Sequence, residues 1–232
     1  MIDAILNLIF PVACILCGSQ VLERRYGAAC PDCWARLPPV KPPICPRCGV
    51  PGVAIEGLCG RCRTGENRFD LARSAVLFNE SAREIVHHLK YSDRVSLAGS
   101  VGRLLRPIRE QDGFSAECAV PVPLHRLRER ERGFNQAALI ARELGLPVEA
   151  GLLRRRKKTT SQTGLSRAER TKNLASAFEL LSGVKGMKVL LVDDVLTTGA
   201  TMNELTKVLK RGGAARVEVL TFARVPDGLS PL

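Results

Sequence analysis

The chain has 232 residues, enough for one ordinary domain and a small second one. Hydrophobic residues make up 45% and charged residues 25%, which excludes a disordered or fibrous protein, and no apolar run approaches the ~20 residues of a membrane span. Lys and Arg total 35 against 23 Asp and Glu, and the resulting formal charge of +12 favours partners that carry phosphate.

The chain opens with a short amphipathic stretch. Residues 2–10 place apolar side chains at helical spacing, so we expect a helix that packs on the protein itself. The first residues do not match a secretory signal, because a basic start is missing and Asp3 and Asn7 interrupt the apolar run. We therefore expect a cytoplasmic protein, in which thiols stay reduced and cysteine pairs bind metal.

Eight of the nine cysteines lie in the first 62 residues and form four Cys-x-x-Cys pairs: Cys14/Cys17, Cys30/Cys33, Cys45/Cys48 and Cys59/Cys62. Each pair can supply half of a tetrahedral zinc shell, and sequential pairing gives two four-cysteine sites. Interleaved pairing and an iron–sulfur cluster are the alternatives. Closed four-thiolate sites offer no position for a substrate, so we expect two structural Zn²⁺ ions. The ninth cysteine, Cys118, stands in an apolar run and is expected in the core.

The composition changes near residue 69, and regular elements follow. Strands are expected over 71–78, 119–123, 188–192 and 217–222, and helices over 81–91, 97–109, 134–144 and 198–210. Strands that alternate with helices predict an α/β domain with a parallel sheet. We expect a small N-terminal domain over residues 1–66 and the α/β domain over 67–232.

The most informative motif follows the strand at 188–192. The strand ends at Asp193 and Asp194, and a loop with the residues Thr197, Thr198, Gly199, Ala200 and Thr201 then opens a helix. Backbone N–H groups at a helix start bind anions, and glycine lets a phosphate approach closely. Carboxylates at the same sheet edge can accept hydrogen bonds from vicinal hydroxyls. The motif therefore predicts a ribose 5-phosphate pocket; the alternative is an ordinary strand-to-helix turn with an Asp metal site.

These residues give the chain its resemblance to a known family. The stretch 189–201 is similar to the phosphoribosyl pyrophosphate motif of type I phosphoribosyltransferases. With the cysteine pairs and the segments Val120–Pro123 and Arg132–Gln136, nearly all of the chain resembles the ComF/GntX family. The resemblance implies a double zinc ribbon over residues 1–66 and a Rossmann-like phosphoribosyltransferase domain over 67–232. It also implies a link to DNA uptake in competence, or to the use of DNA as a nutrient.

The resemblance assigns roles to the acidic motif as well. Asp193 and Asp194 would hold the ribose hydroxyls, together with Mg²⁺ on the substrate, and residues 197–201 would hold the 5-phosphate. Lys90 and Tyr91 match a Lys-Tyr position of the family, so we expect them near the site.

A basic loop after the strand at 119–123 is expected to bind pyrophosphate. It leaves a strand end and enters a helix, and Arg126, Arg132 and Gly133 are the residues expected to serve there. Purine-type members of the superfamily carry a similar Arg-Gly-Phe. The alternating charges also fit a solvated, salt-bridged turn.

A second basic segment, residues 154–172, holds eight Lys or Arg against one acid. Its few apolar positions predict mobility without ligand. The resemblance implies a flexible loop that closes over the substrate, in which Gln162, Arg170 and Asn173 match the family pattern and Arg170 acts inside the site. The alternative is a patch for single-stranded nucleic acid at residues 154–158.

Two functions remain open on this sequence. An enzyme would bind Mg–phosphoribosyl pyrophosphate and transfer the phosphoribosyl group to an acceptor nitrogen. A binding module would sense phosphoribosyl pyrophosphate or a nucleotide, while the zinc ribbons and the basic segment hold single-stranded DNA or a DNA-uptake protein. The two differ in whether an acceptor pocket exists. The zinc ribbons are the one candidate to cover it, and they look unlike the base-binding hood of known transferases.

Overall fold

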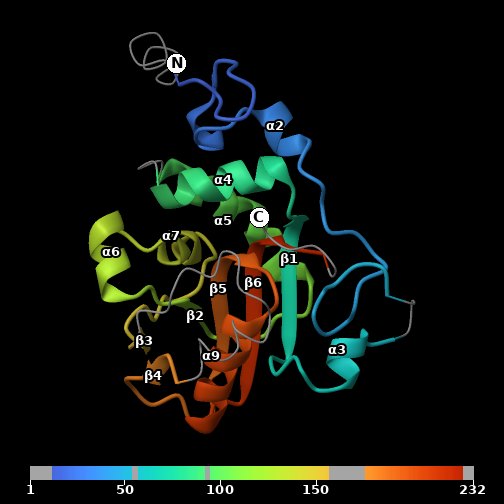
Figure 1. Cartoon of the computed structure of the whole chain (residues 1–232), viewed down its shortest axis with the longest axis vertical. Helices are drawn as coiled ribbons and strands as arrows, with labels where there is room; N and C mark the ends of the chain where they lie inside the picture. Colours follow the sequence, from blue (N-terminus) through green and yellow to red (C-terminus); the bar gives the residue numbers. More distant parts are fainter. Residues whose placement is uncertain (1–11, 54–56, 92–94, 157–175, 227–232) are drawn as a thin grey trace.

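The computed structural model describes residues 12–53, 57–91, 95–156 and 176–226 (Figure 1). Its centre is a four-stranded sheet in the order β1-β6-β5-β2, with every neighbouring pair parallel. The strands are β1 (Leu71–Leu77), β2 (Cys118–Pro121), β5 (Lys188–Leu196) and β6 (Arg216–Arg224). The expected parallel α/β sheet is thus confirmed.

Short and long helices surround this sheet. They are η1 (Arg24–Tyr26), α2 (Pro31–Ala35), α3 (Gly60–Arg63), α4 (Glu80–Tyr91), α5 (Ser96–Gln111), α6 (Arg126–Arg132), α7 (Gln136–Arg142) and α9 (Ala200–Arg211). An antiparallel pair, β3 (Leu153–Arg155) and β4 (Phe178–Leu180), stands apart from the sheet. No helix among these described residues is long and apolar enough to cross a membrane.

The sheet is buried on both faces. Along β5, Leu190 and Val192 belong to one apolar cluster, and Val189 and Leu191 belong to the other. Such alternation follows from the two-residue period of a strand. The first cluster includes side chains of α4, α5 and α7, and the second includes those of α9 and the β3–β4 pair. The result is a three-layered domain.

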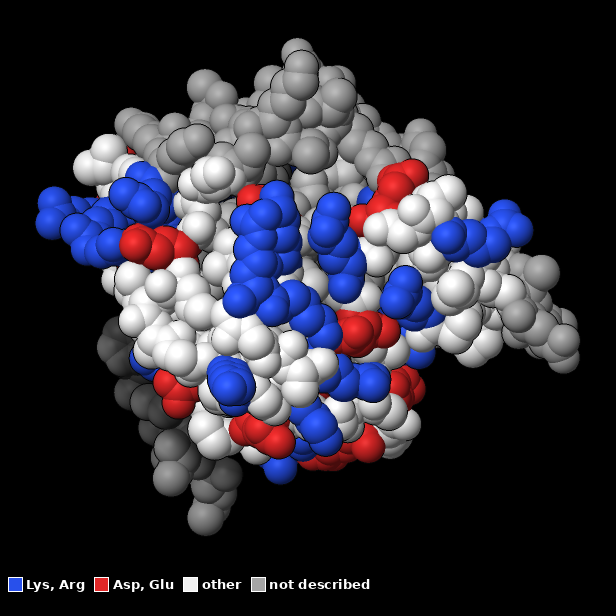
Figure 2. Space-filling model, turned by 90° about the horizontal axis from the view of Figure 1, so that it is seen from below, with Lys and Arg blue, Asp and Glu red and all other residues white. Residues whose placement is uncertain are grey.

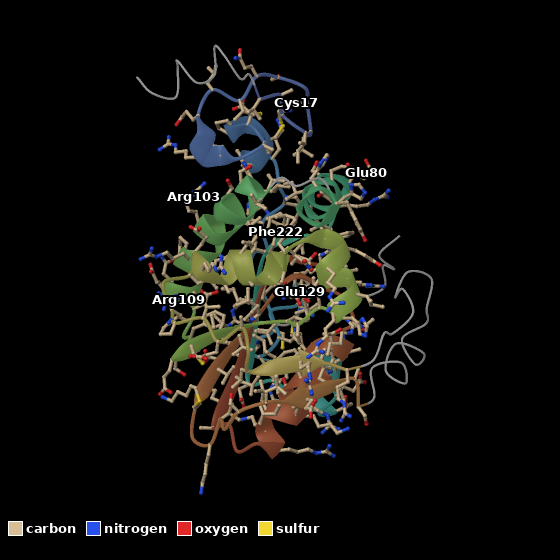
Figure 3. All side chains as sticks on the ribbon, turned by 90° about the vertical axis from the view of Figure 1, so that its left-hand side faces the viewer. Cys17, Glu80, Arg103, Arg109, Glu129 and Phe222 are labelled. Carbon is tan, nitrogen blue, oxygen red and sulfur yellow. The ribbon has the colours of Figure 1, made fainter. Side chains whose placement is uncertain are left out.

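The two cysteine-rich segments join opposite layers. The first ribbon, residues 12–37, packs into the cluster of α4 and α5, and the second ribbon, residues 44–65, packs into the cluster of α9. In the first ribbon, the ring of Trp34 meets the ring of Phe222 edge-on at 6.2 Å between centroids. Phe222 lies near the middle of the molecule, whereas Cys17 lies in the first ribbon, at the top of the view (Figure 3). Both ribbons are therefore built into the core.

The linker between the ribbons covers an edge of the sheet. The N–H of Val40 donates to the carbonyl of Ala75 at 3.0 Å, and the N–H of Leu77 donates to the carbonyl of Pro38 at 2.7 Å. These antiparallel bonds occupy hydrogen-bonding groups of β1 that an edge strand would otherwise expose.

Some elements differ from the expected ones. The helix expected over 134–144 starts at Gln136, because the side chain of Asn135 accepts the N–H of Ala137 at 2.9 Å and caps it. The basic loop before it is the helix α6, which ends where Gly133 adopts a φ of +78°. Strand β5 extends to Leu196, since its ladder with β6 continues past the acidic pair. The helix expected over 2–10 lies outside the described residues.

We expect the first ribbon and the sheet to unfold together. The change Phe222→Ala should lower the free energy of unfolding by about 3–5 kcal/mol, because it removes a fully buried ring. Trp34, the one tryptophan of the chain, reports on the ribbon by fluorescence, and far-UV circular dichroism reports on the sheet. In urea the two signals should share one midpoint, lowered equally in the variant.

The matched control is Leu181→Ala, at a side chain that is 48% exposed, which should change stability by less than about 0.5 kcal/mol. A fluorescence transition that clearly precedes the circular dichroism transition would mean that the ribbon is an independent unit.

Candidate functional site

A pocket of about 250 Å³ opens at the carboxyl ends of β2 and β5. Seven segments contribute to its wall: the end of α4, the segment after β2, α6, the start of α7, β3, the end of β5 with its loop, and the start of α9. Parallel sheets bind ligands at this edge, where strand ends and helix starts converge. The pocket is therefore the candidate site.

The acidic pair lies at the floor of this pocket, within the last residues of β5. Asp194 is buried and its Oδ2 forms an ion pair with Nζ of Lys90 at 2.5 Å. Oδ1 of Asp193 accepts the N–H of Asp194 at 2.9 Å. Lys90 is the penultimate residue of α4, so the ion pair ties the end of that helix to the central strand.

The two carboxyls are electrostatically unequal. Burial raises the pKa of Asp193 well above its usual value, and the charge of Asp194 adds to the rise. Burial also opposes ionisation of Asp194, but the charge of Lys90 and the hydrogen bonds from Asp193 and Lys90 together outweigh it and lower the pKa of Asp194. Burial likewise opposes the charged form of Lys90, but the charge and hydrogen bond of Asp194, together with the charge of Asp193, raise the pKa of Lys90. Asp194 thus holds a compensated charge, while Asp193 is poised to ionise when a cation or hydroxyl donors reach it.

The segment of residues 197–201, called here the Thr-Gly loop, runs from the end of β5 into the first two residues of α9. Gly199 precedes the helix with a φ of +76°, a left-handed conformation that favours glycine. Thr197, Gly199 and Thr201 line the pocket. Helix α9 has 12 residues, and its first turn lies at this wall. The first turn of a helix has N–H groups without helical partners and carries the positive end of the helix dipole. The loop is therefore suited to an anion such as phosphate.

Three arginines complete the charged wall: Arg128 and Arg132 of α6, and Arg155 of β3. The guanidinium of Arg132 lies over the ring of Tyr91, 5.2 Å from its centroid, and donates to Oε1 of Gln136 at 2.5 Å. Burial lowers the pKa of Arg155. With Lys90, four cationic side chains face two carboxyls, which suits a ligand with several phosphates and a hydroxylated ring.

The structure brings most of the expected residues together. Asp193, Asp194, Lys90 and Tyr91 line the pocket together with Thr197, Gly199, Thr201 and Arg132. Thr198 and Ala200 lie on the outer side of the Thr-Gly loop, where they line a second hollow. Gln162, Arg170 and Asn173 lie outside the described residues, so their roles stay predictions.

Arg126 and Gly133 are not on the pocket wall. They line a separate hollow with Glu129 and Arg130. The reason is that the basic segment is a helix: residues 128 and 132 are one turn apart and share a face, whereas residue 126 is turned away. Arg128 therefore stands where the sequence suggested Arg126, and the i, i+4 spacing was the signal that could have found it.

Sequence reasoning also missed Gln136 and Arg155. Arg154 and Arg155 were expected in a mobile basic segment, but they belong to β3, which pairs with β4. Strand alternation separates them: Arg155 lines the pocket, while Arg154 donates to Oε2 of Glu179 at 2.7 Å.

The cysteines group sequentially into two clusters, Cys14, Cys17, Cys30 and Cys33 in the first ribbon and Cys45, Cys48, Cys59 and Cys62 in the second. Their Sγ atoms lie within 4.8 Å of one another in each cluster. The Sγ atoms of Cys17 and Cys30 are 3.7 Å apart, and those of Cys48 and Cys59 are 3.6 Å apart. Tetrahedral zinc with bonds of about 2.3 Å separates its sulfurs by about 3.8 Å, so both clusters fit zinc.

The second cluster is connected to the sheet by a buried charge. Arg224 of β6 is 2% exposed and donates to the carbonyl of Cys48 at 2.6 Å, and it lies 3.8 Å from the Sγ of that cysteine. Zinc with four thiolates carries a net negative charge, which this guanidinium can balance.

Comparison with known proteins defines the class. A family model described as "Double zinc ribbon domain" matches residues 5–63, and one described as "Phosphoribosyl transferase domain" matches residues 130–232. The chain therefore combines a double zinc ribbon with a domain of the phosphoribosyltransferase type. The boundary between residues 66 and 67 stays a prediction.

Relatives extend over almost the whole chain. It is 33% identical over 223 residues to "DNA utilization protein YhgH" of Salmonella typhimurium, covering 92% of this chain and 97% of the relative. It is 30% identical over 227 residues to "Competence protein F" of Haemophilus influenzae, covering 93% and 98%. The chain belongs to the ComF/GntX family. A solved purine phosphoribosyltransferase from Pyrococcus horikoshii is 16% identical to this chain, and the match covers 60% of this chain and 90% of the solved one with a TM-score of 0.32.

The ion pair at the pocket floor predicts a pH-dependent loss of stability in Lys90→Met. At neutral pH the variant should lose about 1–3 kcal/mol of unfolding free energy, because Asp194 stays buried without its cation, a cost reduced by the partial exposure of Lys90. The lowered pKa of Asp194 means that the pair stabilises the protein above the unfolded value of 3.8. The difference from wild type should therefore shrink as the pH falls below that value.

Urea unfolding at a series of pH values measures this difference. Lys41→Met removes the same charge from an exposed position and serves as the control. A loss in Lys90→Met that is independent of pH would show that packing, not charge, is what Lys90 supplies.

Proposed function

We propose that the pocket binds phosphoribosyl pyrophosphate as its Mg²⁺ complex. In this assignment the Thr-Gly loop takes the 5-phosphate, Asp193 and Asp194 take the ribose hydroxyls, and the arginines of α6 and β3 take the diphosphate. The observation that carries the proposal is the placement of an anion-binding helix start beside two carboxyls at one strand end, facing four cations.

The chemistry that follows is group transfer at C1′. An acceptor nitrogen would bond to C1′ while the bond from C1′ to the pyrophosphate oxygen breaks, and the pyrophosphate would leave with the electron pair. The acceptor would lose its proton to solvent or to a group near the pocket. A bound Mg²⁺ would supply charge neutralisation on the phosphates. Arg128, Arg132 and Arg155 would hold the diphosphate in place and stabilise its growing charge.

The test has two steps. Calorimetric titration of the zinc-loaded chain with Mg–phosphoribosyl pyrophosphate measures binding, and a pyrophosphate-release screen over bases and amines measures turnover. Saturable binding at one site per chain is the expected result. Absence of binding at millimolar ligand would reject the assignment.

A second candidate function is binding of single-stranded nucleic acid by a non-catalytic module. Two observations favour it. The relatives carry the names "DNA utilization protein" and "Competence protein". On the face that carries α9 and β4, Lys and Arg gather in a band across the middle (Figure 2). In this reading the chain is a cytoplasmic protein with a role in DNA uptake or use, and the phosphoribosyl pocket senses a nucleotide.

The acceptor compartment separates the two candidates. No residue of either zinc ribbon lines the pocket in the part of the chain that the structure describes. The ribbons, the one candidate to cover an acceptor, thus do not contribute to the described wall of this pocket. Tyr91, which is 70% exposed, is the aromatic ring at the pocket wall against which an acceptor base could stack.

Asp193 offers the cleanest test of the ribose assignment. Asp193→Asn should weaken Mg–phosphoribosyl pyrophosphate binding about 10- to 100-fold, since one charge-assisted bond is worth about 1.5–3 kcal/mol. Stability at neutral pH should hold or rise, because burial disfavours the charged form of Asp193. Asp194 is unsuitable for this test, since its removal would strand Lys90.

Affinity is measured by calorimetry across pH. In wild type it should rise with pH as Asp193 ionises, and in the variant that component should vanish, leaving only the titration of the ligand's phosphates. Unchanged affinity and pH dependence in a folded variant would remove the ribose assignment.

The three arginines at positions 154–156 separate the two candidate functions. Arg155→Met should weaken phosphoribosyl pyrophosphate binding about 10- to 100-fold, the size of one charge-assisted contact. The matched double variant, Arg154→Met with Arg156→Met, should leave that binding intact, because these two side chains are 39% and 64% exposed.

If the outer arginines contact a nucleic acid backbone, the double variant should flatten the salt dependence for a labelled single strand. The expected change in slope is about 1.4, at about 0.7 per lost phosphate contact. An unaltered salt dependence would place the nucleic-acid surface elsewhere or remove it.

A further inference from the structure

The second zinc ribbon touches the Thr-Gly loop from its outer side. Arg61 lies in α3 between the cysteines Cys59 and Cys62 of the second cluster. Its guanidinium donates to the carbonyl oxygen of Thr198 and, at 3.4 Å, to Oδ1 of Asn67. Its side chain is only 15% exposed, so a zinc-binding turn of the ribbon and the loop that is proposed to hold phosphate share one contact.

Asn67 extends this contact to the metal cluster itself. It is 3% exposed, and its Nδ2 donates to Sγ of Cys62 at 3.2 Å while its Oδ1 accepts from Arg61. An amide with one end on a metal-binding sulfur and the other on a guanidinium has a fixed orientation. Asn67 therefore holds Arg61 in place relative to the second cluster.

A neighbouring contact holds the first turn of α9. The N–H of Arg68 donates to Oδ1 of Asn203 at 2.8 Å, and the N–H of Asn203 donates to the carbonyl of Gly199 at 2.8 Å. A Cβ added to Gly199 would meet Oδ1 of Asn67 at 3.5 Å. The segment 61–68 thus lies against the loop and the first turn of α9.

The contact at Thr198 has a consequence inside the pocket. In a trans peptide the carbonyl and the following N–H point in opposite directions. Thr198 and Arg61 line the outer hollow, whereas Gly199 lines the pocket. By fixing the Thr198 carbonyl outward, Arg61 turns the Gly199 N–H inward, where an anion would accept from it.

We propose that Arg61 is a positioning residue for the Thr-Gly loop and that zinc in the second ribbon, unlike zinc in the first, is coupled to ligand binding. The first ribbon packs in the apolar cluster of α4 and α5, on the opposite layer of the domain, and the residues by which α4 lines the pocket, Lys90 and Tyr91, are not part of that cluster. Coupling between two sites is reciprocal, so a ligand that the loop binds also strengthens zinc retention at the second cluster. The effect on ligand binding rests on the proposed function; the effect on loop order does not.

The first test is hydrogen exchange of the ligand-free, zinc-loaded chain, followed by mass spectrometry. In Arg61→Ala, amides of the peptide over 197–203 should exchange about tenfold faster. In Arg63→Ala, which removes an exposed arginine from the same helix, they should exchange as in wild type. Unchanged exchange in Arg61→Ala, with both zinc ions still bound, would overturn the positioning role.

The second test uses ribose 5-phosphate as the probe. Its dissociation constant should rise about tenfold in Arg61→Ala and stay unchanged in Arg63→Ala. If wild type itself fails to bind ribose 5-phosphate, the proposed function falls, and the exchange experiment still decides the role of Arg61.

The third test measures zinc transfer to a chromogenic chelator. Saturating ribose 5-phosphate should slow the loss of one zinc per chain severalfold in wild type and leave the other unaffected. In Arg61→Ala this protection should disappear. Equal release of both ions with and without ribose 5-phosphate, in a wild type that binds it, would overturn the coupling.

Discussion

Two adjacent carboxyls held at the end of a buried strand are the constraint on which the site depends. Strand β5 lies between β6 and β2, and both faces of the sheet are covered, so its end is a poor place for two uncompensated charges. Lys90 balances one of them and thereby fixes the end of α4 against the sheet. Burial holds the other, Asp193, toward its neutral form, so a ligand has to supply the cation or the hydroxyl donors that favour its ionisation. Catalytic or sensory use of the pocket would draw on the same unbalanced carboxyl.

The zinc ribbons also contribute to the packing and the charge balance around the sheet. One fills the layer of α4 and α5 through Trp34, and the other contacts the sheet through Arg224 and the Thr-Gly loop through Arg61. A four-cysteine site that is closed to substrates can still act on the pocket when its turn holds a loop of that pocket. A double ribbon can therefore support the pocket of a phosphoribosyltransferase domain without covering an acceptor.

Local patterns were sufficient for much of this architecture. The strand, acidic pair and Thr-Gly loop are contiguous, and the cysteine pairs have one spacing, so the sequence predicted both sites. The parallel sheet followed from the alternation of elements. Contacts between distant segments were beyond such reasoning: β3 pairs with β4 across an intervening segment, and Arg61 reaches a residue 137 positions away. Alternating charges in 126–132 fit a turn as well as a helix, which is why Arg128 was overlooked.

The central claim is that the acidic pair and the Thr-Gly loop form one bipartite site for a phosphorylated ribose. Calorimetric titration of the zinc-loaded chain with ribose 5-phosphate, ribose and inorganic phosphate, each in the presence of Mg²⁺, tests it most directly. The account predicts that ribose 5-phosphate binds at one site per chain and far more tightly than either fragment. Equal affinity for ribose 5-phosphate and inorganic phosphate would contradict it, because the carboxyls would then contribute nothing to recognition.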